Sequence, residues 1–230
     1  MKRTGIVGVL VGGLALVAQA ATMQIGTGLD GSGNPLNAYD QDLNYGVSGG
    51  GCSTALVYPL GLWPLDGSAW VPNQVLNQPY GQWISPLDPT TTWEQHAGVT
   101  KNFSQAPSTL FTFTRTIPAG FSSISGKFSS DNPGAMFLNG SAAPVVQSPG
   151  WSQIPSDTYD WGVWTKFFNV TLNPNQVNTI TFEVYNLPGD APGNPAGLIV
   201  AVTAVPDGGL TAMLLGIGML GLGAIRRKVS

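Results

Sequence analysis

The 230-residue chain has one cysteine, one histidine and few charged residues, and each shortage excludes a class of chemistry. Because Cys52 has no second cysteine to pair with, no intrachain disulfide can form. His96 is the one histidine, which removes most catalytic triads and nearly all zinc sites. Only 9% of the residues are charged. What remains is a chain rich in apolar, aromatic and turn-forming residues.

Positive charge is scarce between residues 22 and 204. This range holds four basic and eleven acidic residues, so 4 − 11 gives a net charge of −7. Nucleic-acid binding needs clustered Lys and Arg to displace counterions, so we expect no nucleic-acid partner. A length of about 180 residues is ample for one hydrophobic core.

The N-terminus has the pattern of a secretory signal peptide. Met1-Lys2-Arg3 is a basic start, residues 6–17 are an apolar core, and Ala18-Gln19-Ala20 is an Ala-x-Ala cleavage site. Gly12-Gly13 interrupts the apolar core, which is also too short to span a bilayer. We therefore predict a signal helix in residues 1–20 that is removed after export.

The C-terminus combines a short motif, an apolar run and a basic end. Val205-Pro206-Asp207-Gly208-Gly209 precedes an uncharged run from Leu210 to Ile225, and Arg226-Arg227-Lys228 follows. As a helix, this run would cover about 24 Å of a hydrocarbon core of roughly 30 Å, and snorkelling arginines can extend it. The basic residues predict a cytoplasmic C-terminus. We predict a transmembrane helix within residues 205–230, with the preceding domain outside.

These three parts, in this order at the extreme terminus, resemble the sorting signal of the PEP-CTERM class in its Val-Pro-Asp variant. The resemblance implies an exosortase-type membrane protease as a partner, which recognises the motif and releases the domain toward the cell surface or matrix. The motif departs from Pro-Glu-Pro, so the sortase subtype stays open. A permanent one-helix anchor is the alternative, because hydropathy fits both.

Residues 22–204 have the pattern of a single all-β domain, because no long helical periodicity occurs outside the termini. Residues 22–107 are rich in turn signals, with 55–58 and 82–84 as brief or edge strands. Longer strands are expected at 109–117, 124–129, 135–138, 142–146, 165–172, 179–185 and 197–204. Short strands joined by regular turns predict a β-sandwich of the jelly-roll type.

Alternation along these strands predicts the core-facing side chains. Phe111, Phe113 and Ile117 share one face of the first long strand. In the later strands we expect three further sets on one face: Phe168, Val170 and Leu172; Ile180, Phe182 and Val184; Leu198, Val200 and Val202. Asn139-Gly140 predicts a two-residue hairpin turn, because both residues tolerate positive φ.

Several segments in this order resemble galactose-binding-like β-sandwiches. They are Trp83-Ile84, residues 110–117, Ser130-Asp131-Asn132, residues 137–140, residues 178–186 and Ala196-Gly197-Leu198. The resemblance covers about residues 83–202. It implies a binding or structural module that acts on surface carbohydrate, and it names no ligand.

Aromatic residues and carboxylates gather between two expected strands. Our candidates for glycan binding are Trp151, Asp157, Tyr159, Asp160 and Trp161, with Trp164 close by. Indole rings stack on sugar rings, and neighbouring carboxylates accept hydrogen bonds from hydroxyl groups. The alternative is that these aromatics close the end of the sandwich as core residues, with Trp164 the best candidate for the core.

An acidic segment offers the only metal candidates. Asp30-Gly31-Ser32-Gly33-Asn34 resembles the start of a calcium loop, but Pro35 and Gln41 occupy positions where an EF-hand needs Gly and Glu. A looser site built on Asp30, Asp40 or Asp42 could hold a structural calcium ion, and an acidic turn without an ion is the alternative. We expect no other cofactor.

Two functions remain open. The first is a non-catalytic surface or matrix protein that binds or organises extracellular polysaccharide. The second is an exported hydrolase acting on a glycan or ester. Ser48 lies in a Gly-x-Ser-x-Gly pattern, with Asp88 and His96 after it, but no helix is expected where a nucleophile elbow needs one. A glycosidase would need two carboxyl groups about 5–9.5 Å apart, for example Asp157 or Asp160 opposite Glu94.

Overall fold

A computed structural model of the chain describes residues 21–57, 81–87, 109–153, 162–186 and 196–208, and the single residue 216. Residues Ala21–Asp207 form one compact unit. No helix among the described residues has the length and hydropathy to cross a membrane. The predicted signal helix, and nearly all of the predicted C-terminal helix, lie outside the described residues.

The regular structure described in residues 21–207 consists of strands and one short 3₁₀ helix. The strands are β1 (Met23–Gln24), β2 (Gly46–Ser48), β3 (Thr54–Val57), β4 (Ile84–Leu87), β5 (Thr109–Ile117), β6 (Phe121–Asp131), β7 (Gly134–Leu138), β8 (Val146–Gln147), β9 (Thr165–Thr171), β10 (Asn178–Asn186) and β11 (Gly197–Pro206). The 3₁₀ helix η2 (Trp151–Gln153) lies between β8 and β9 in the chain.

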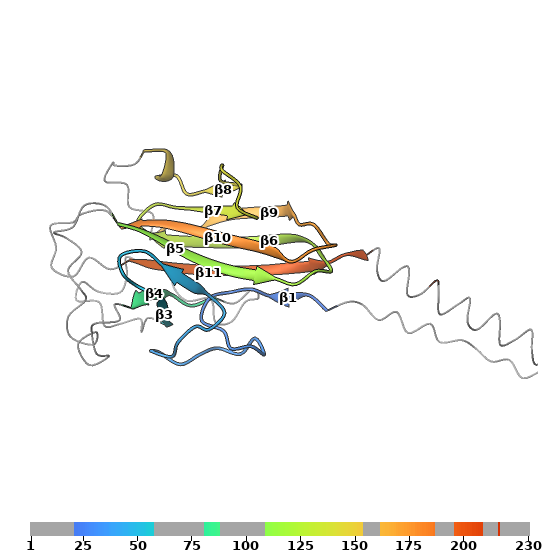
Figure 1. Cartoon of the computed structure of the whole chain (residues 1–230), viewed down its shortest axis with the longest axis horizontal. Helices are drawn as coiled ribbons and strands as arrows, with labels where there is room; N and C mark the ends of the chain where they lie inside the picture. The colour runs from blue at the N-terminus through green and yellow to red at the C-terminus, as the bar shows by residue number, and fades with distance from the viewer. Residues whose placement is uncertain are drawn as a thin grey trace, which may run out of the picture. The chain divides into compact units, whose positions relative to one another are not determined.

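The strands form two antiparallel sheets (Figure 1). The first sheet, which we call the β6 sheet, has the order β3-β4-β11-β6-β9, with β1 also paired to β11. The second, the β10 sheet, has the order β2-β5-β10-β7-β8. The chain passes repeatedly from one sheet to the other between β5 and β11. An all-β domain built of two antiparallel sheets confirms the predicted fold class at this level.

Core packing follows the alternation expected from the sequence. Phe111, Phe113 and Ile117 of β5 are fully buried, and so are the alternate core residues of β10 and β11. Phe128 of β6 packs edge-on against Phe182 of β10, with ring centroids 5.3 Å apart and planes at 63°. This pair joins the two sheets through their inner faces.

Strand β9 differs from the prediction at Phe168. The side chain of Phe168 is 75% exposed, whereas Phe167 is buried in the core. Pairing with β6 shifts register between Ile124 and Gly126, and Asn169 has a φ of +51°. This bulge gives β9 one extra residue, so Phe167 and Val170 both point inward while Phe168 points out. The expected inward position of Phe168 is therefore wrong.

The turn after β7 forms as predicted, but the returning strand does not. Asn139 and Gly140 have φ of +52° and +71°, and the amide of Ser141 donates to the Leu138 carbonyl at 3.0 Å. The strand expected at 142–146 is reduced to Val146–Gln147. Pro144 has no N–H to donate to a strand partner, which explains the delayed pairing.

Gly126 offers a test of the close approach between β6 and β11. A Cβ added there would collide with the Ala201 carbonyl oxygen and would lie 2.7 Å from Val202 Cα, both backbone atoms of the neighbouring strand. Gly126→Ala should lower the free energy of unfolding by about 1–3 kcal/mol, because β11 must shift. Gly31→Ala, where a Cβ meets nothing within 4 Å, is the matched control. Equal denaturation midpoints for the two variants would contradict this packing.

Candidate functional site

Three aromatic side chains gather on the outer face of the β10 sheet, and we call them the aromatic cluster. Phe137 of β7 and Tyr185 of β10 are out of phase with the core-facing residues of their strands. Trp151 of η2 packs on both, with ring centroids 6.0 Å from Phe137 and 5.5 Å from Tyr185. Each of the three is only partly buried. Their rings therefore form a connected apolar surface that water still reaches.

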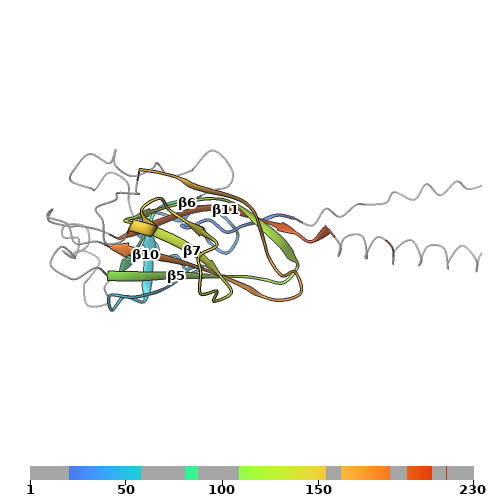
Figure 2. The same cartoon turned by 90° about the horizontal axis from the view of Figure 1, so that it is seen from above.

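Backbone hydrogen bonds hold Trp151 beside the sheet. The Trp151 amide donates to the Ser148 carbonyl at 3.1 Å, and the Ser148 amide donates to the Gly134 carbonyl at 2.8 Å. The Gly134 amide in turn donates to Ser148 Oγ at 3.0 Å. In Figure 1, η2 lies on the same side of the molecule as β7 and β8, and Figure 2 shows it near β7 and β10. The start of β7 thus fixes the position of the indole ring.

Tyr185 is anchored to the same region. Its amide donates to the Pro133 carbonyl at 3.0 Å, and its carbonyl accepts from the Asn132 amide at 2.9 Å. The backbones of Tyr185 and Trp151 are therefore both tied to β7 or to the two residues that precede it, and Phe137 belongs to β7 itself. A site built on paired strands keeps its geometry better than one on a free loop.

Polar groups border the aromatic cluster on the same outer face. Glu183 lies two residues before Tyr185, in register with Ala135 on one side and Thr112 on the other. Partial burial raises the pKa of Glu183 above its ordinary value through desolvation. Thr181 and Thr114 form the next register pair along this face. An apolar wall beside a few carboxylate and hydroxyl groups can stack on a ring and hydrogen-bond to hydroxyls.

The structure describes only part of the predicted glycan-binding set. Trp151 is part of the aromatic cluster, whereas Asp157, Tyr159, Asp160 and Trp161 lie outside the described residues and stay predictions. Sequence reasoning missed three residues of this face, Phe137, Glu183 and Tyr185. The available signal was their phase, because each sits on the face of its strand opposite the core residues.

Trp164 belongs to a different surface. Lys127 Nζ of β6 lies 4.2 Å from the centroid of the Trp164 ring, a cation–π geometry. Trp164 is only partly buried, so it is not one of the fully buried core residues that the alternative interpretation expected.

The three candidate metal ligands each accept separate hydrogen bonds. Asp30 accepts from the amides of Ser32 and Asn34, both at 2.8 Å, and from Asn34 Nδ2 at 3.0 Å. The bonds from Asn34, the largest contribution, hold the pKa of Asp30 below its ordinary value. The Asp40 carboxylate accepts hydrogen bonds from the backbone amide and from the side-chain amide of Asn37. Each of these two carboxylates closes a local turn.

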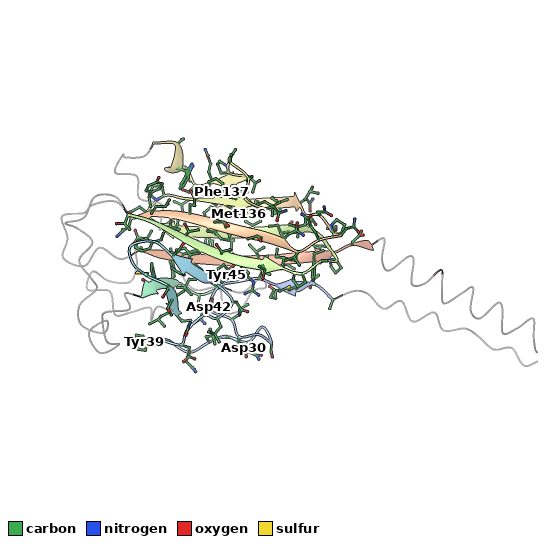
Figure 3. All side chains as sticks on the ribbon, in the orientation of Figure 1. Asp30, Tyr39, Asp42, Tyr45, Met136 and Phe137 are labelled. Atoms are coloured by element: carbon green, nitrogen blue, oxygen red, sulfur yellow. The ribbon has the colours of Figure 1, made fainter. Side chains whose placement is uncertain are left out.

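Asp42 is fully buried beside this loop. Its carboxylate accepts from the Gly28 amide at 2.7 Å and the Asn44 amide at 2.9 Å. Desolvation raises the pKa of Asp42, although these hydrogen bonds and the charge of Arg115 act in the opposite direction. Figure 3 shows Asp30 and Asp42 in the loop segment, away from Phe137 on β7. No group of three or more His, Cys, Asp or Glu in the described segments is arranged to hold a metal. The calcium site stays a prediction.

Arg115 is an unexpected member of the inner face of β5. It is only 7% exposed, and its guanidinium carbon lies 5.5 Å from the centroid of the Tyr45 ring. The Tyr45 hydroxyl donates to the Ile25 carbonyl at 2.6 Å, and burial raises the pKa of Tyr45. Asp42, Tyr45 and Arg115 together tie the loop before β2 to the edge of the β10 sheet.

Ser48 lies in a different local structure from a nucleophile elbow. It ends the short strand β2, and its side chain is exposed. Gly49, Gly50 and Gly51 all have positive φ, and the chain then enters β3, so no helix follows the serine. Asp88, Glu94 and His96 lie outside the described residues.

The sorting motif begins inside the sheet. Val205 and Pro206 are the last residues of β11 and pair with β6. Ser122 Oγ donates to their carbonyl oxygens at 3.4 and 3.3 Å, and the Asp207 amide donates to the Gly120 carbonyl at 2.8 Å. Gly209 and the basic residues Arg226, Arg227 and Lys228 lie outside the described residues.

The opposite pKa shifts of Asp42 and Asp30 predict opposite pH dependences. For Asp42, the unfolded chain loses its proton at lower pH than the folded chain, so ionisation costs stability as the pH rises. We therefore compare the free energy of unfolding of wild type with that of Asp42→Asn. The value for wild type minus the value for the variant should fall as the pH rises from about 3 to about 7. For Asp30→Asn it should rise, because ionised Asp30 stabilises the fold.

Chemical denaturation of the three proteins at several pH values would measure both differences. Since Asp30 and Asp42 lie in the same loop region, each variant controls for the other. A pH-independent difference between wild type and Asp42→Asn would contradict the burial of an ionisable carboxyl group there.

Comparison with curated proteins finds no match, and solved structures resemble the chain at low identity. A beta-glucosidase from Kluyveromyces marxianus is 15% identical, with 46% of this chain and 12% of that chain covered and a TM-score of 0.31. TmCBM61 in complex with beta-1,4-galactotriose is 12% identical, covering 72% and 90%, with a TM-score of 0.35. A mutant of the family 29 carbohydrate-binding module CBM29-2, complexed with cellulohexaose, is 16% identical, covering 82% and 94%, with a TM-score of 0.28. The chain thus spans 12% of the beta-glucosidase, and likenesses this distant carry no argument about function.

The C-terminus gives a specific match. Residues 204–229 match the VPDSG-CTERM motif, with Gly208 where the letters of the motif have serine. The match contains the predicted sequence Val205-Pro206-Asp207-Gly208-Gly209 and the basic end. The chain therefore carries a PEP-CTERM-like exosortase sorting signal, as its sequence predicted, and this signal implies an exported, surface-targeted protein.

Proposed function

We propose that this protein is a non-catalytic carbohydrate-binding protein of the cell surface, and that the aromatic cluster is its binding site. The single observation that carries the proposal is the partly exposed packing of Trp151 against Phe137 and Tyr185 on the outer face of a sheet. A sugar ring has an apolar face of C–H groups that stacks on aromatic rings. The ligand is an extracellular polysaccharide. The C-terminal sorting signal directs the protein to the cell surface, where it would meet this ligand.

The polar neighbours suit the hydroxyl groups of a saccharide. Glu183 can accept hydrogen bonds from two hydroxyls, and its partial desolvation strengthens each bond relative to bulk water. Thr112 and Thr181 offer hydroxyls that both donate and accept. A polar strip along one side of an apolar wall fixes the orientation of a bound ring.

The fold supports the same proposal. We assign the sandwich to the galactose-binding-like jelly rolls, because the chain alternates between two antiparallel sheets from β5 to β11. Asp157, Tyr159, Asp160 and Trp161 follow η2 in the chain and would extend the site beyond the aromatic cluster.

Substitutions in the aromatic cluster test the binding site. In full-length protein in a detergent without a sugar head group, Trp151→Ala and Tyr185→Ala should each weaken binding to neutral glycans about fivefold, since a stacking contact contributes on the order of 1 kcal/mol. Trp151→Phe should keep part of the affinity, because a ring remains. Glu183→Gln should weaken binding without changing side-chain volume. A glycan panel with titration of the best ligand gives the affinities.

Val177→Ala, in the exposed turn between β9 and β10, is the control for loss of an apolar side chain. Melting curves of the same variants separate binding from folding. Suppose that Trp151→Ala lowers the free energy of unfolding by about 3–5 kcal/mol while the folded fraction keeps full affinity. Trp151 would then be a core residue, and the proposed binding site would be wrong.

Processing of the tail is a further part of the proposal. We propose that the mature protein lacks residues 1–20 and the segment from Leu210 onward, after cleavage by signal peptidase and an exosortase-type protease. Replacing Arg226, Arg227 and Lys228 by Gln should impair processing, because the basic end retains the C-terminus in the cytoplasm. Intact-mass measurement of the surface protein checks whether both ends are removed and whether the variant is still processed. Mature surface protein that retains residues 210–230 would instead show a permanent transmembrane anchor.

A further inference from the structure

The outer face of the β6 sheet carries two lysines and two aromatic residues, which we call the lysine face. Lys127 of β6 and Lys166 of β9 are direct register partners, both on the side of their strands opposite Phe128 and Phe167 of the core. Trp164 lies just before β9 and packs on the Lys127 ammonium. Phe168, two residues after Lys166, is the fourth member.

The pairing of these lysines places two positive charges side by side. Like charges directly across neighbouring strands repel each other, and burial together with the charge of Lys166 lowers the pKa of Lys127. Residues 22–204 contain four basic residues and carry a net charge of −7, so a random arrangement would rarely bring two lysines together. Two like charges held side by side on an otherwise acidic domain are typical of a binding site for a negatively charged partner.

We propose that the lysine face binds an anionic polysaccharide, with Lys127 and Lys166 contacting its carboxylate or sulfate groups and Phe168 stacking on a sugar ring. The site is separate from the aromatic cluster, because the two lie on outer faces of different sheets. Cβ atoms of a direct cross-strand pair lie about 5 Å apart, so both ammonium groups can reach one charged sugar or two successive ones.

The surroundings favour a saccharide over other polyanions. The cation–π contact with Trp164 orients Lys127 along the sheet surface. Phe168 offers one exposed ring, while the Trp164 ring is in contact with the Lys127 ammonium. A single exposed ring suits stacking on a sugar better than insertion into lipid, for which a wider apolar face is needed. Ser125 Oγ accepts from the Asn169 amide at 2.8 Å, so hydroxyl and amide groups border the lysines.

The test uses full-length protein in an uncharged detergent without a sugar head group. Polygalacturonate represents a carboxylated chain, dextran sulfate a sulfated one, and dextran the neutral backbone. We expect binding to at least one of the two charged polymers, weakening as salt is raised, and weaker binding to dextran. The charged polymer that binds more tightly identifies the anionic group. Lys166→Gln should reduce affinity about threefold to fivefold, and Lys166→Arg should retain it. Phe168→Ala should reduce affinity for the same polymer.

Matched controls distinguish a site from general electrostatics. Gln176→Glu, in the exposed turn before β10, lowers the net charge by one as Lys166→Gln does, and should leave affinity nearly unchanged. Trp151→Ala should also leave it unchanged, so failure of the proposed neutral-glycan site would not affect this result. Four outcomes would overturn the proposal: dextran binding as tightly as the charged polymers, Lys166→Gln weakening binding to phosphatidylglycerol vesicles more than binding to either polyanion, an equal loss in Gln176→Glu, or unchanged affinity in Phe168→Ala.

Discussion

The pairing of β11 with β6 is the interaction on which the rest of the structure depends. The register runs continuously from Gly197 opposite Asp131 to Val205 opposite Ser123, and β1 and β4 pair with the other edge of β11. A central strand with neighbours on both edges satisfies its backbone groups, and the first six residues of β11 are buried on both faces of the sheet. Because β11 ends at Pro206, the first residues of the sorting motif belong to the same strand that organises the β6 sheet. The sorting signal therefore begins at the C-terminal end of the strand that organises the fold.

Period-two alternation explains why the domain can pack one core and still present two different outer faces. Phe111, Phe113 and Phe182 point inward, and the residues between them point out whatever their chemistry. On the β10 sheet the outward positions carry aromatic rings, threonines and Glu183. On the β6 sheet they carry the two lysines. Each surface follows from which residues occupy the outward phase of strands whose inward phase is already fixed by burial.

The same alternation also explains how far the sequence could predict this structure. Core residues of β5, β10 and β11, the turn at Asn139-Gly140 and the sorting signal could be read from local patterns. The bulge at Asn169 could not, because it depends on pairing with β6, and it reversed the expected direction of Phe168. The aromatic cluster brings together three elements separated in the chain. The register of β7 with β10 pairs Phe137 with Thr181, so Trp151 of η2 is what links the rings of Phe137 and Tyr185. Local patterns predict the facing of a residue, but contacts between strands decide its neighbours.

The buried charges at the edge of the sandwich follow a different physical logic from the outer faces. Asp42 and Arg115 attract each other without a direct ion pair, and their main partners are backbone amides for Asp42 and the Tyr45 ring for Arg115. Since an unpaired buried charge is costly, each of these contacts restricts where the loop before β2 can lie. The loop is therefore held against β5 by electrostatic and hydrogen-bonding constraints as well as by the buried side chains of Ile25, Leu29 and Tyr45. The outer lysines, in contrast, repel each other across β6 and β9, and the anion that we propose would relieve that repulsion. Charge inside the fold orders the chain, whereas the paired charge on its surface is what the proposed anionic ligand would contact.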